Sequence, residues 1–144
     1  MTSNAERADY TLPPKAGFIL THFLTVADVS RSAAFYARVL GGQIIRSGEP
    51  TILQVANSWI ILNVGGGPTD DKPTVTLHPP RNLDEATSFM NIRVADVQAC
   101  YEEWRGKGAE FLTEPKDHGM EIRCYMRDPD GYLIEVGQWR LPPG

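Results

Sequence analysis

The sequence predicts an α+β protein built from two tandem βαβββ modules, and three observations lead to this expectation. The segment Val26-Ala27-Asp28-Val29 recurs in the second half of the chain as Val94-Ala95-Asp96-Val97. In each copy the aspartate is a good helix N-cap, and apolar residues follow at helical spacing until glycines end the pattern. Short alternating runs around each helix are typical of half-buried strands. A repeat of this kind indicates one structural unit used twice.

The first module is expected to hold one helix and four strands. Asp28 caps the helix, and the pair Gly41-Gly42 ends it. Turn residues separate the strands, which we expect at residues 18–26, 43–46, 51–56 and 59–64.

The second module repeats this order after a long glycine- and proline-rich connector. Asp96 caps its helix, and strands are expected at residues 88–94, 109–113, 122–126 and 133–138. Neither half is large enough to bury its own sheet well, so the modules must pair, either in one chain or between two chains. The expected organisation is an N-terminal arm at 1–17 and a single domain at 18–140, with module one at 18–64, a linker at 65–87 and module two at 88–140.

Composition restricts the class of protein. The chain has 144 residues with 42% hydrophobic and 22% charged residues, as in an ordinary globular domain. Its formal net charge is −4 without a basic block, which argues against a nucleic-acid partner, and no apolar run approaches a membrane span. Cys100 and Cys124 lie far apart without metal-type spacing, so both are expected to be reduced and the location cytoplasmic.

A carboxylate in the last expected strand is the first functional candidate. Turn chemistry at Asp128-Pro129-Asp130-Gly131 leads into a strand that carries Glu135 on the same face as Leu133 and Gly137. A buried, lone carboxylate costs roughly several kcal/mol unless it finds a partner, whereas a strand face that is open to water needs none. Alternation places Arg93 on the same face of its own strand as Phe89 and Asn91, and Arg93 is a candidate partner for Glu135.

The two most characteristic segments are VADVSRSAAFYARVLGG at 26–42 and RDPDGYLIEVGQ at 127–138. Together with the tandem plan they resemble the vicinal oxygen chelate superfamily, which includes glyoxalase I, bleomycin-resistance proteins, fosfomycin-resistance enzymes and extradiol dioxygenases. The resemblance covers about residues 18–140. It implies two sheets curled around a ligand cavity. In the enzymes of this superfamily a divalent metal is held by one residue from the first strand and one from the last strand of each module.

The resemblance allows the four metal positions of the superfamily to be carried over to this sequence. Among the four residues found there, Glu135 is the one good metal ligand. The repeat places Asn63 opposite Glu135, and counting back from the two capping aspartates gives Thr21 and Phe89. A β-bulge in the first strand would bring His22 to the cavity in place of Thr21, whereas a regular strand turns His22 toward the helix. The candidate metal ligands are therefore His22 and Glu135. The cation, if one binds, would be zinc, nickel, iron or manganese.

Three functions stay open at this stage. The first is a cavity protein with a degenerate metal site that binds or sequesters a small aromatic or anionic ligand. Its candidate ligand-binding residues are Phe23, Thr25, Asn63, Phe89, Asn91 and Arg93, with stacking surface from Trp59 or Trp139. The alternative is a metal-dependent glyoxalase- or dioxygenase-type enzyme, a lyase, isomerase or oxygenase, that uses Glu135 and His22. A third possibility is metal-free catalysis with Glu135 as the base. A homodimer is expected because closed two-fold pairing is the commonest symmetry.

Overall fold

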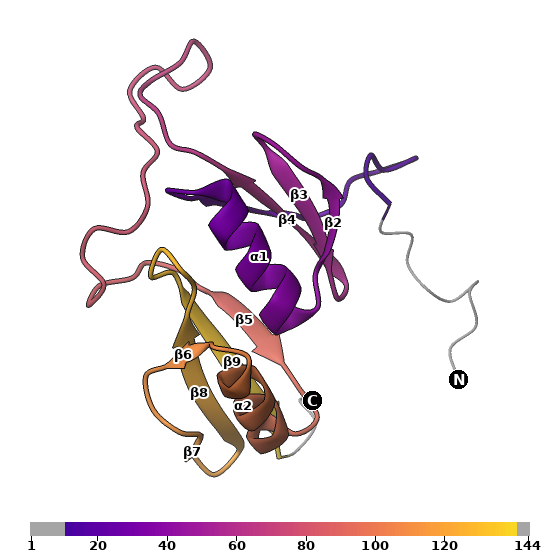
Figure 1. Ribbon diagram of the computed structural model, residues 1–144, viewed down its shortest axis with the longest axis vertical. Coiled ribbons are helices and arrows are strands. Elements are labelled where there is room, and N and C mark those ends of the chain that lie inside the picture. Colours follow the sequence, from indigo (N-terminus) through magenta and orange to yellow (C-terminus); the bar gives the residue numbers. More distant parts are fainter. Residues whose placement is uncertain (1–10, 141–144) are drawn as a thin grey trace.

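The computed structural model describes residues 11–140 and contains two βαβββ modules, stacked one above the other along the long axis of the molecule (Figure 1). The first module comprises β1 (His22–Thr25), α1 (Val29–Leu40), β2 (Gln43–Arg46), β3 (Thr51–Val55) and β4 (Ser58–Asn63). Its sheet has the order β1-β4-β3-β2, with β1 parallel to β4 and the other pairs antiparallel.

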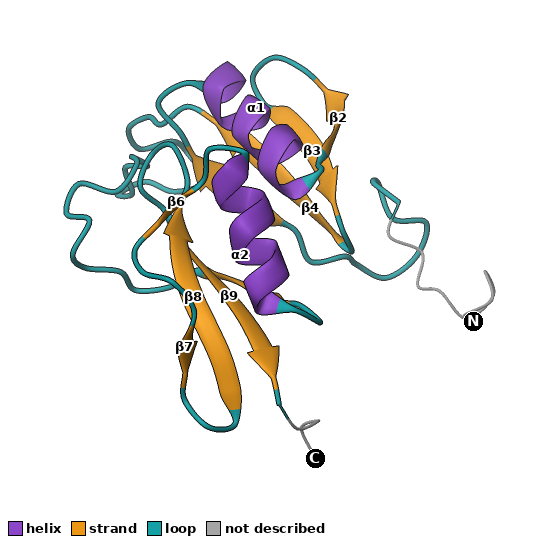
Figure 2. Cartoon of the chain, turned by 60° about the horizontal axis from the view of Figure 1, so that its bottom comes forward, coloured by secondary structure: helices purple, strands orange, loops and turns teal. Residues whose placement is uncertain are grey.

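The second module repeats this plan with one short extra strand. It comprises β5 (Met90–Arg93), α2 (Val97–Gly106), β6 (Glu110–Phe111), β7 (Lys116–Asp117), β8 (Glu121–Arg127) and β9 (Leu133–Trp139). The sheet order is β5-β9-β8-β6, β5 is parallel to β9, and β7 pairs with β8. The prediction of an α+β fold made of tandem βαβββ modules with mixed sheets is confirmed (Figure 2).

Both predicted helix caps are present. The Asp28 side chain accepts a hydrogen bond of 3.1 Å from the backbone N–H of Arg31, and the Asp96 side chain accepts one of 3.0 Å from Ala99. Each bond satisfies an N–H that has no partner inside the helix. α1 stops because Gly41 adopts the left-handed conformation at φ 71°, which costs glycine little.

The first strand is shorter than expected. Residues 18–21 have strand-like composition, but they form no strand, and Phe18 and Leu20 are 87% and 85% exposed. β6 is likewise cut to two residues of the expected 109–113, and β7 was not predicted because two residues carry no alternation signal. Residues 1–10 of the expected arm lie outside the described residues, and residues 11–17 form neither helix nor strand.

The core lies between each helix and the inner face of its sheet. Its largest fully buried apolar side chains come from α1, α2, four strands and the residue that follows β1: Val26, Tyr36, Val39, Leu53, Leu62, Val97, Cys124, Met126, Ile134 and Val136. Burying one large apolar side chain contributes about 1.5–3 kcal/mol, so this layer fixes which face of each sheet stays free. Cys100 and Cys124 are both free thiols, as expected.

The Asp128-Pro129-Asp130-Gly131 turn fastens the second module to the first. The hydroxyl of Tyr36 on α1 donates a buried hydrogen bond of 2.8 Å to Asp128. Asp130 accepts from the backbone N–H of Ala27 at 3.0 Å and from Arg31 at 3.1 Å. The turn that joins β8 to β9 therefore holds the N-terminal end of α1.

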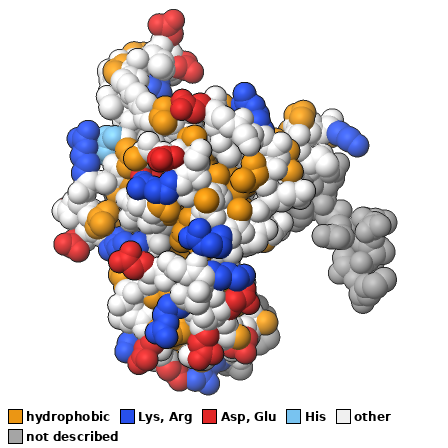
Figure 3. Space-filling view, viewed as in Figure 1, with side chains coloured by type: hydrophobic (Ala, Val, Ile, Leu, Met, Phe, Trp, Pro, Cys, Tyr) orange, Lys and Arg blue, Asp and Glu red, His pale blue; other side chains and the backbone are white. Residues whose placement is uncertain are grey.

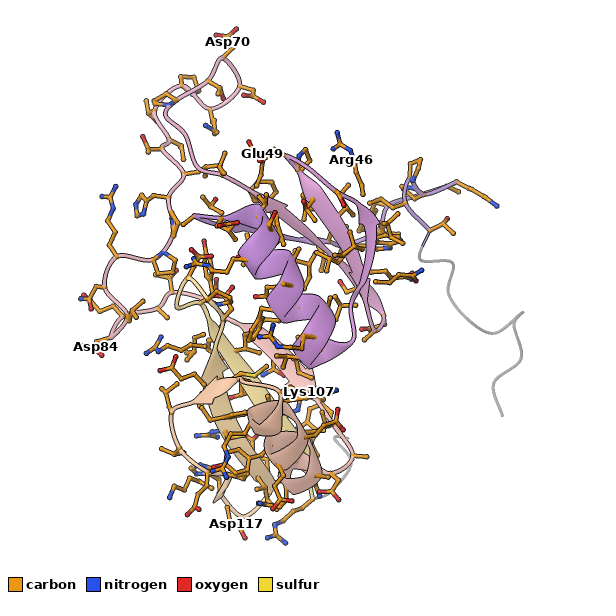
Figure 4. The ribbon with its side chains drawn as sticks, in the orientation of Figure 1. Arg46, Glu49, Asp70, Asp84, Lys107 and Asp117 are labelled. Atoms are coloured by element: carbon orange, nitrogen blue, oxygen red, sulfur yellow. The ribbon has the colours of Figure 1, made fainter. Side chains whose placement is uncertain are left out.

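Contacts at the other end of α1 also join the modules. Arg38 Nε donates to the carbonyl of Lys107, at the end of α2, over 2.9 Å, and Figure 4 shows Lys107 at this junction. Between the modules the chain runs through a projecting hairpin in which Gly66 pairs with Leu77, and Asp70 marks its tip in Figure 4. None of the helices within residues 11–140 combines the length and apolarity that crossing a membrane requires.

Candidate functional site

Glu135 lies in the middle of β9, on the face of the second sheet that points away from α2. Alternation turns its neighbours Ile134 and Val136 into the core, and both are fully buried. The register places Asn91 of β5 on one side of Glu135 and Tyr125 of β8 on the other. These flanking side chains cover the carboxylate, which leaves Glu135 only 7% exposed although neither α1 nor α2 covers this face.

Three side chains donate to the Glu135 carboxylate. The Tyr125 hydroxyl donates to Oε2 at 2.6 Å, while Asn91 Nδ2 and Arg93 Nη1, the latter at 3.3 Å, donate to Oε1. This geometry agrees with the expectation that a buried Glu135 needs a partner and that Arg93 is the candidate. The hydrogen bond to Glu135 is the main cause that raises the pKa of Tyr125, and burial adds to it, so the phenol stays protonated and donating.

Arg93 lies flat on the sheet and links two carboxylates. Its Nη2 donates to Glu121 Oε1 at 2.9 Å while Nη1 reaches Glu135. Its guanidinium stacks 4.5 Å from the ring centroid of Trp139. This position depends on Gly137, since a Cβ there would lie 2.4 Å from Arg93 Nη2.

Glu121, at the start of β8, extends the arrangement. Its Oε2 accepts from Arg123 Nη1 at 3.0 Å, and the hydrogen bond from Arg93 is the main cause that lowers its pKa. We call the connected side chains of this face the Glu135 network: Asn91, Arg93, Glu121, Arg123, Tyr125 and Glu135. Phe89 borders the network, with its ring centroid 5.9 Å from that of Tyr125. Figure 3 shows acidic and basic side chains interspersed on the visible side of the second module.

The structure brings together some of the candidate ligand-binding residues and separates others. Asn91 and Arg93 belong to the Glu135 network, and Phe89 adjoins it. Asn63 is engaged locally, since its Oδ1 accepts from the backbone N–H of Val64 at 2.9 Å, and Thr25 is buried in the first module. Neither lines the clefts described next.

Two clefts follow the junction between the modules, with volumes of about 430 Å³ and 450 Å³. His22 and Met90 line both. Phe23 and Phe89 share the first cleft, whereas Asn91 and Arg93 line the second. The second cleft therefore reaches the edge of the Glu135 network.

Sequence reasoning missed Glu121 as a site residue. Alternation puts Arg123, Tyr125 and Arg127 on one face of their strand, but alternation alone does not say which face points inward. That choice is made by the pairing of β8 with β9, which sets Tyr125 opposite Glu135.

The position of His22 does not suit a shared metal site with Glu135. β1 pairs regularly with β4, setting His22 opposite Ile60, so no bulge turns the imidazole to the open face. His22 thus faces the same side as Leu24, toward α1, and burial lowers its pKa. Glu135 lies on the open face of the other sheet.

The strand register also corrects the inherited metal positions. Val26 N–H donates to the Asn63 carbonyl, and Val94 N–H donates to the Gly137 carbonyl. These matching bonds make Asn63 the equivalent of Gly137, so Ile61 is the equivalent of Glu135, and the expected pairing of Asn63 with Glu135 is wrong. The pairing of Asn63 with Glu135 follows from aligning Val64-Gly65 with Val136-Gly137, and that alignment is two residues away from the register of the strands.

The donor set does not fit a superfamily metal. Thr21, Ile61 and Phe89 stand at the other three positions, and an isoleucine or a phenylalanine side chain carries no metal-binding atom. Both oxygens of Glu135 already accept hydrogen bonds. Within residues 11–140 there is no group of three or more His, Cys, Asp or Glu side chains that could hold a metal ion.

The chain matches a protein-family model and is similar in sequence to several curated proteins. Residues 19–136 match the model of the Glyoxalase/Bleomycin resistance protein/Dioxygenase superfamily. The chain is 25% identical over 128 residues to a probable lactoylglutathione lyase of Synechocystis sp., covering 84% of this chain and 95% of that protein. It is 29% identical over 126 residues to the lactoylglutathione lyase of Escherichia coli O157:H7, covering 82% and 90%.

Solved structures support the same fold. A glyoxalase/bleomycin resistance protein/dioxygenase from Nocardioides superposes with a TM-score of 0.69 at 19% identity, covering 92% of this chain and 91% of that chain. The fosfomycin resistance protein FosX from Listeria monocytogenes gives a TM-score of 0.63 at 18% identity, covering 88% and 96%.

Proposed function

This chain belongs to the glyoxalase/bleomycin resistance protein/dioxygenase superfamily, and on that premise we propose that it binds or sequesters a small aromatic or anionic molecule without a resident metal. The observation that carries the proposal is the state of Glu135. It is the one inherited metal position with a good ligand, and it is held by Asn91, Arg93 and Tyr125 instead.

Arg93 gives the physical reason for a degenerate metal site. A buried carboxylate needs a compensating charge, and the guanidinium supplies it at 3.3 Å from Glu135 Oε1. A divalent cation binding Glu135 would have to displace this cation and its hydrogen bonds, with few further protein ligands to offset the loss.

The side chains of the open face favour an aromatic or anionic ligand. Phe89 and Trp139 are exposed there, and Tyr125 lies between them along the sheet. Aromatic rings stack on such side chains, and the guanidinium groups of Arg93 and Arg123 attract anions.

We propose that the protein is a homodimer in which a second copy faces the open sheets across the ligand site. Phe23, Phe89 and Trp139 are all exposed, and large exposed apolar side chains are common in association surfaces. Residues 18–140 would act as one domain, with the connector at 65–87 between the modules. The two free cysteines support a cytoplasmic location.

The second candidate is a metal-dependent enzyme of the lactoylglutathione lyase kind, which the names of the curated relatives favour. It would need His22 and Glu135 on one cation. That arrangement requires a shifted register in β1 and release of Glu135 from Arg93 and Asn91.

Elemental analysis of protein purified without chelator separates the two candidates. We expect clearly less than one equivalent of zinc, nickel, iron or manganese, and little rise in melting temperature when these metals are added, because weak binding adds little stability. The control is an assay of lactoylglutathione formation in the presence of nickel or zinc. A stoichiometric metal that disappears in His22→Ala and Glu135→Gln would overturn the proposal in favour of the enzyme.

A further inference from the structure

Glu121 bridges two arginines that flank Gly137. The register sets both Arg93 of β5 and Arg123 of β8 beside this glycine. Glu121 Oε1 accepts from Arg93 at 2.9 Å, and Oε2 accepts from Arg123 at 3.0 Å. A single carboxylate thus spans two guanidinium groups across a strand that has no side chain between them.

Arg93 has an unmet donor beside this carboxylate. Its Nε is buried and is without a hydrogen-bond partner among the described residues. Nε and Nη2 lie on one edge of the planar guanidinium, an edge that can bind a carboxylate through two parallel hydrogen bonds. Glu121 accepts from Nη2 alone, so one of the two hydrogen bonds that this edge can donate is formed and the bond from Nε is not.

Glu121 is also far easier to displace than Glu135. Its side chain is 26% exposed and that of Arg123 is 32% exposed, against 9% for Glu135. Exposed ion pairs contribute little net free energy, whereas Glu135 has three donors and is screened from water. An incoming anion would therefore replace Glu121 and leave Glu135 in place.

The aromatic side chains around Arg93 indicate which chemical group should accompany the negative charge of an incoming anion. The Trp139 ring lies 4.5 Å from the Arg93 guanidinium, and the edge-to-face pair of Phe89 and Tyr125 borders the other side of the network. An aromatic ring attached directly to a carboxylate would stack on this surface while its two oxygens reach the arginines.

We propose that Arg93 and Arg123 form the subsite for the carboxylate of a small aromatic acid, and that Glu121 occupies this subsite until the ligand displaces it. The inference rests on the proposed function and gives its ligand a chemical class. Glu121 acts as an internal competitor that lowers the affinity for weak or nonaromatic anions.

Calorimetric titration of the full chain with sodium benzoate tests this competition. Glu121→Gln removes the competing charge and should bind benzoate about fivefold more tightly than the unaltered protein, the factor that two exposed ion pairs contribute together. Glu103→Gln on α2 is the matched control, because it removes an equal charge from an exposed pair with Lys107 and should leave binding unchanged. Adding Arg123→Gln to Glu121→Gln should cancel the gain.

Benzamide, which has the same ring without the charge, separates this inference from the proposed function. Its affinity should not change in Glu121→Gln. If benzoate binds the unaltered protein but Glu121→Gln binds it no more tightly, or if benzamide gains equally, the competitor role is refuted and the binding function stands. If neither compound binds any variant, both proposals fail. Should Glu121→Gln not fold, Arg123→Gln alone decides the matter: its affinity for benzoate must fall while its affinity for benzamide does not.

Discussion

Replacing Gly137 by alanine should break the ion pairs of Arg93 without touching a charged residue. The added Cβ would lie 2.4 Å from Nη2, 2.6 Å from Cζ and 2.8 Å from Nη1 of Arg93. All three distances are shorter than a Cβ atom keeps from a nonbonded heavy atom. The guanidinium is the far end of a flexible side chain, so it will swing away rather than force the backbone apart. Its bonds to Glu135 at 3.3 Å and to Glu121 at 2.9 Å would then be lost.

The magnitude follows from the burial of Glu135. Losing a hydrogen bond to a charged, nearly buried group costs about 1.5–3 kcal/mol. Replacing glycine by alanine recovers about 0.4–1 kcal/mol, because the unfolded chain loses conformational freedom. We expect Gly137→Ala to lower the free energy of unfolding by about 1–2 kcal/mol, measured by urea denaturation.

Two comparisons make this expectation decisive. Gly106→Ala is the matched control, since a Cβ at that helical glycine meets nothing within 4 Å, and it should be neutral or stabilising. The double variant Gly137→Ala with Arg93→Ala should be little less stable than Arg93→Ala alone, because both changes remove the same bonds. A Gly137→Ala protein as stable as the unaltered one, or fully additive effects, would refute the reasoning.

Three further predictions test other parts of the molecule. Tyr36→Phe removes the hydroxyl donor of the buried Asp128 and should cost about 1–3 kcal/mol of unfolding free energy in urea denaturation, and an unchanged midpoint would contradict the role given to this bond. The lowered pKa of Glu121 stabilises the fold above the ordinary value of 4.5, and this contribution is lost as pH falls through the lowered pKa. Melting temperatures recorded from pH 7 downward should therefore fall less steeply in Glu121→Gln, and parallel curves would count against the pairing. Light scattering at micromolar concentration should give the mass of a dimer, and a monomer there would refute the proposed homodimer.

The fold could be predicted from local patterns, because both helix caps and most strands depend on residues close in sequence. The exceptions depend on distant partners. Phe18 and Leu20 have strand composition, yet none of the strands described between residues 11 and 140 pairs with their segment. Local alternation likewise placed Glu135 and Arg93 on one face.

The rest of the site could not be predicted, because it depends on how strands are aligned. Only the pairing of β8 with β9 shows that Tyr125 faces Glu135 and that Glu121 reaches Arg93. The same limitation produced the wrong equivalence of Asn63 with Glu135, since a matching dipeptide does not fix the register between strands.

The Asp128-Pro129-Asp130-Gly131 turn has a consequence for how related sequences should be compared. Its two carboxylates are occupied with α1, through Tyr36 and Arg31, and neither belongs to the Glu135 network. Selection for this turn can therefore preserve the joint between modules while residues on the open sheet face change freely. Two proteins that share the turn share a scaffold, and their chemistries can differ completely while the sequence of the turn stays the same.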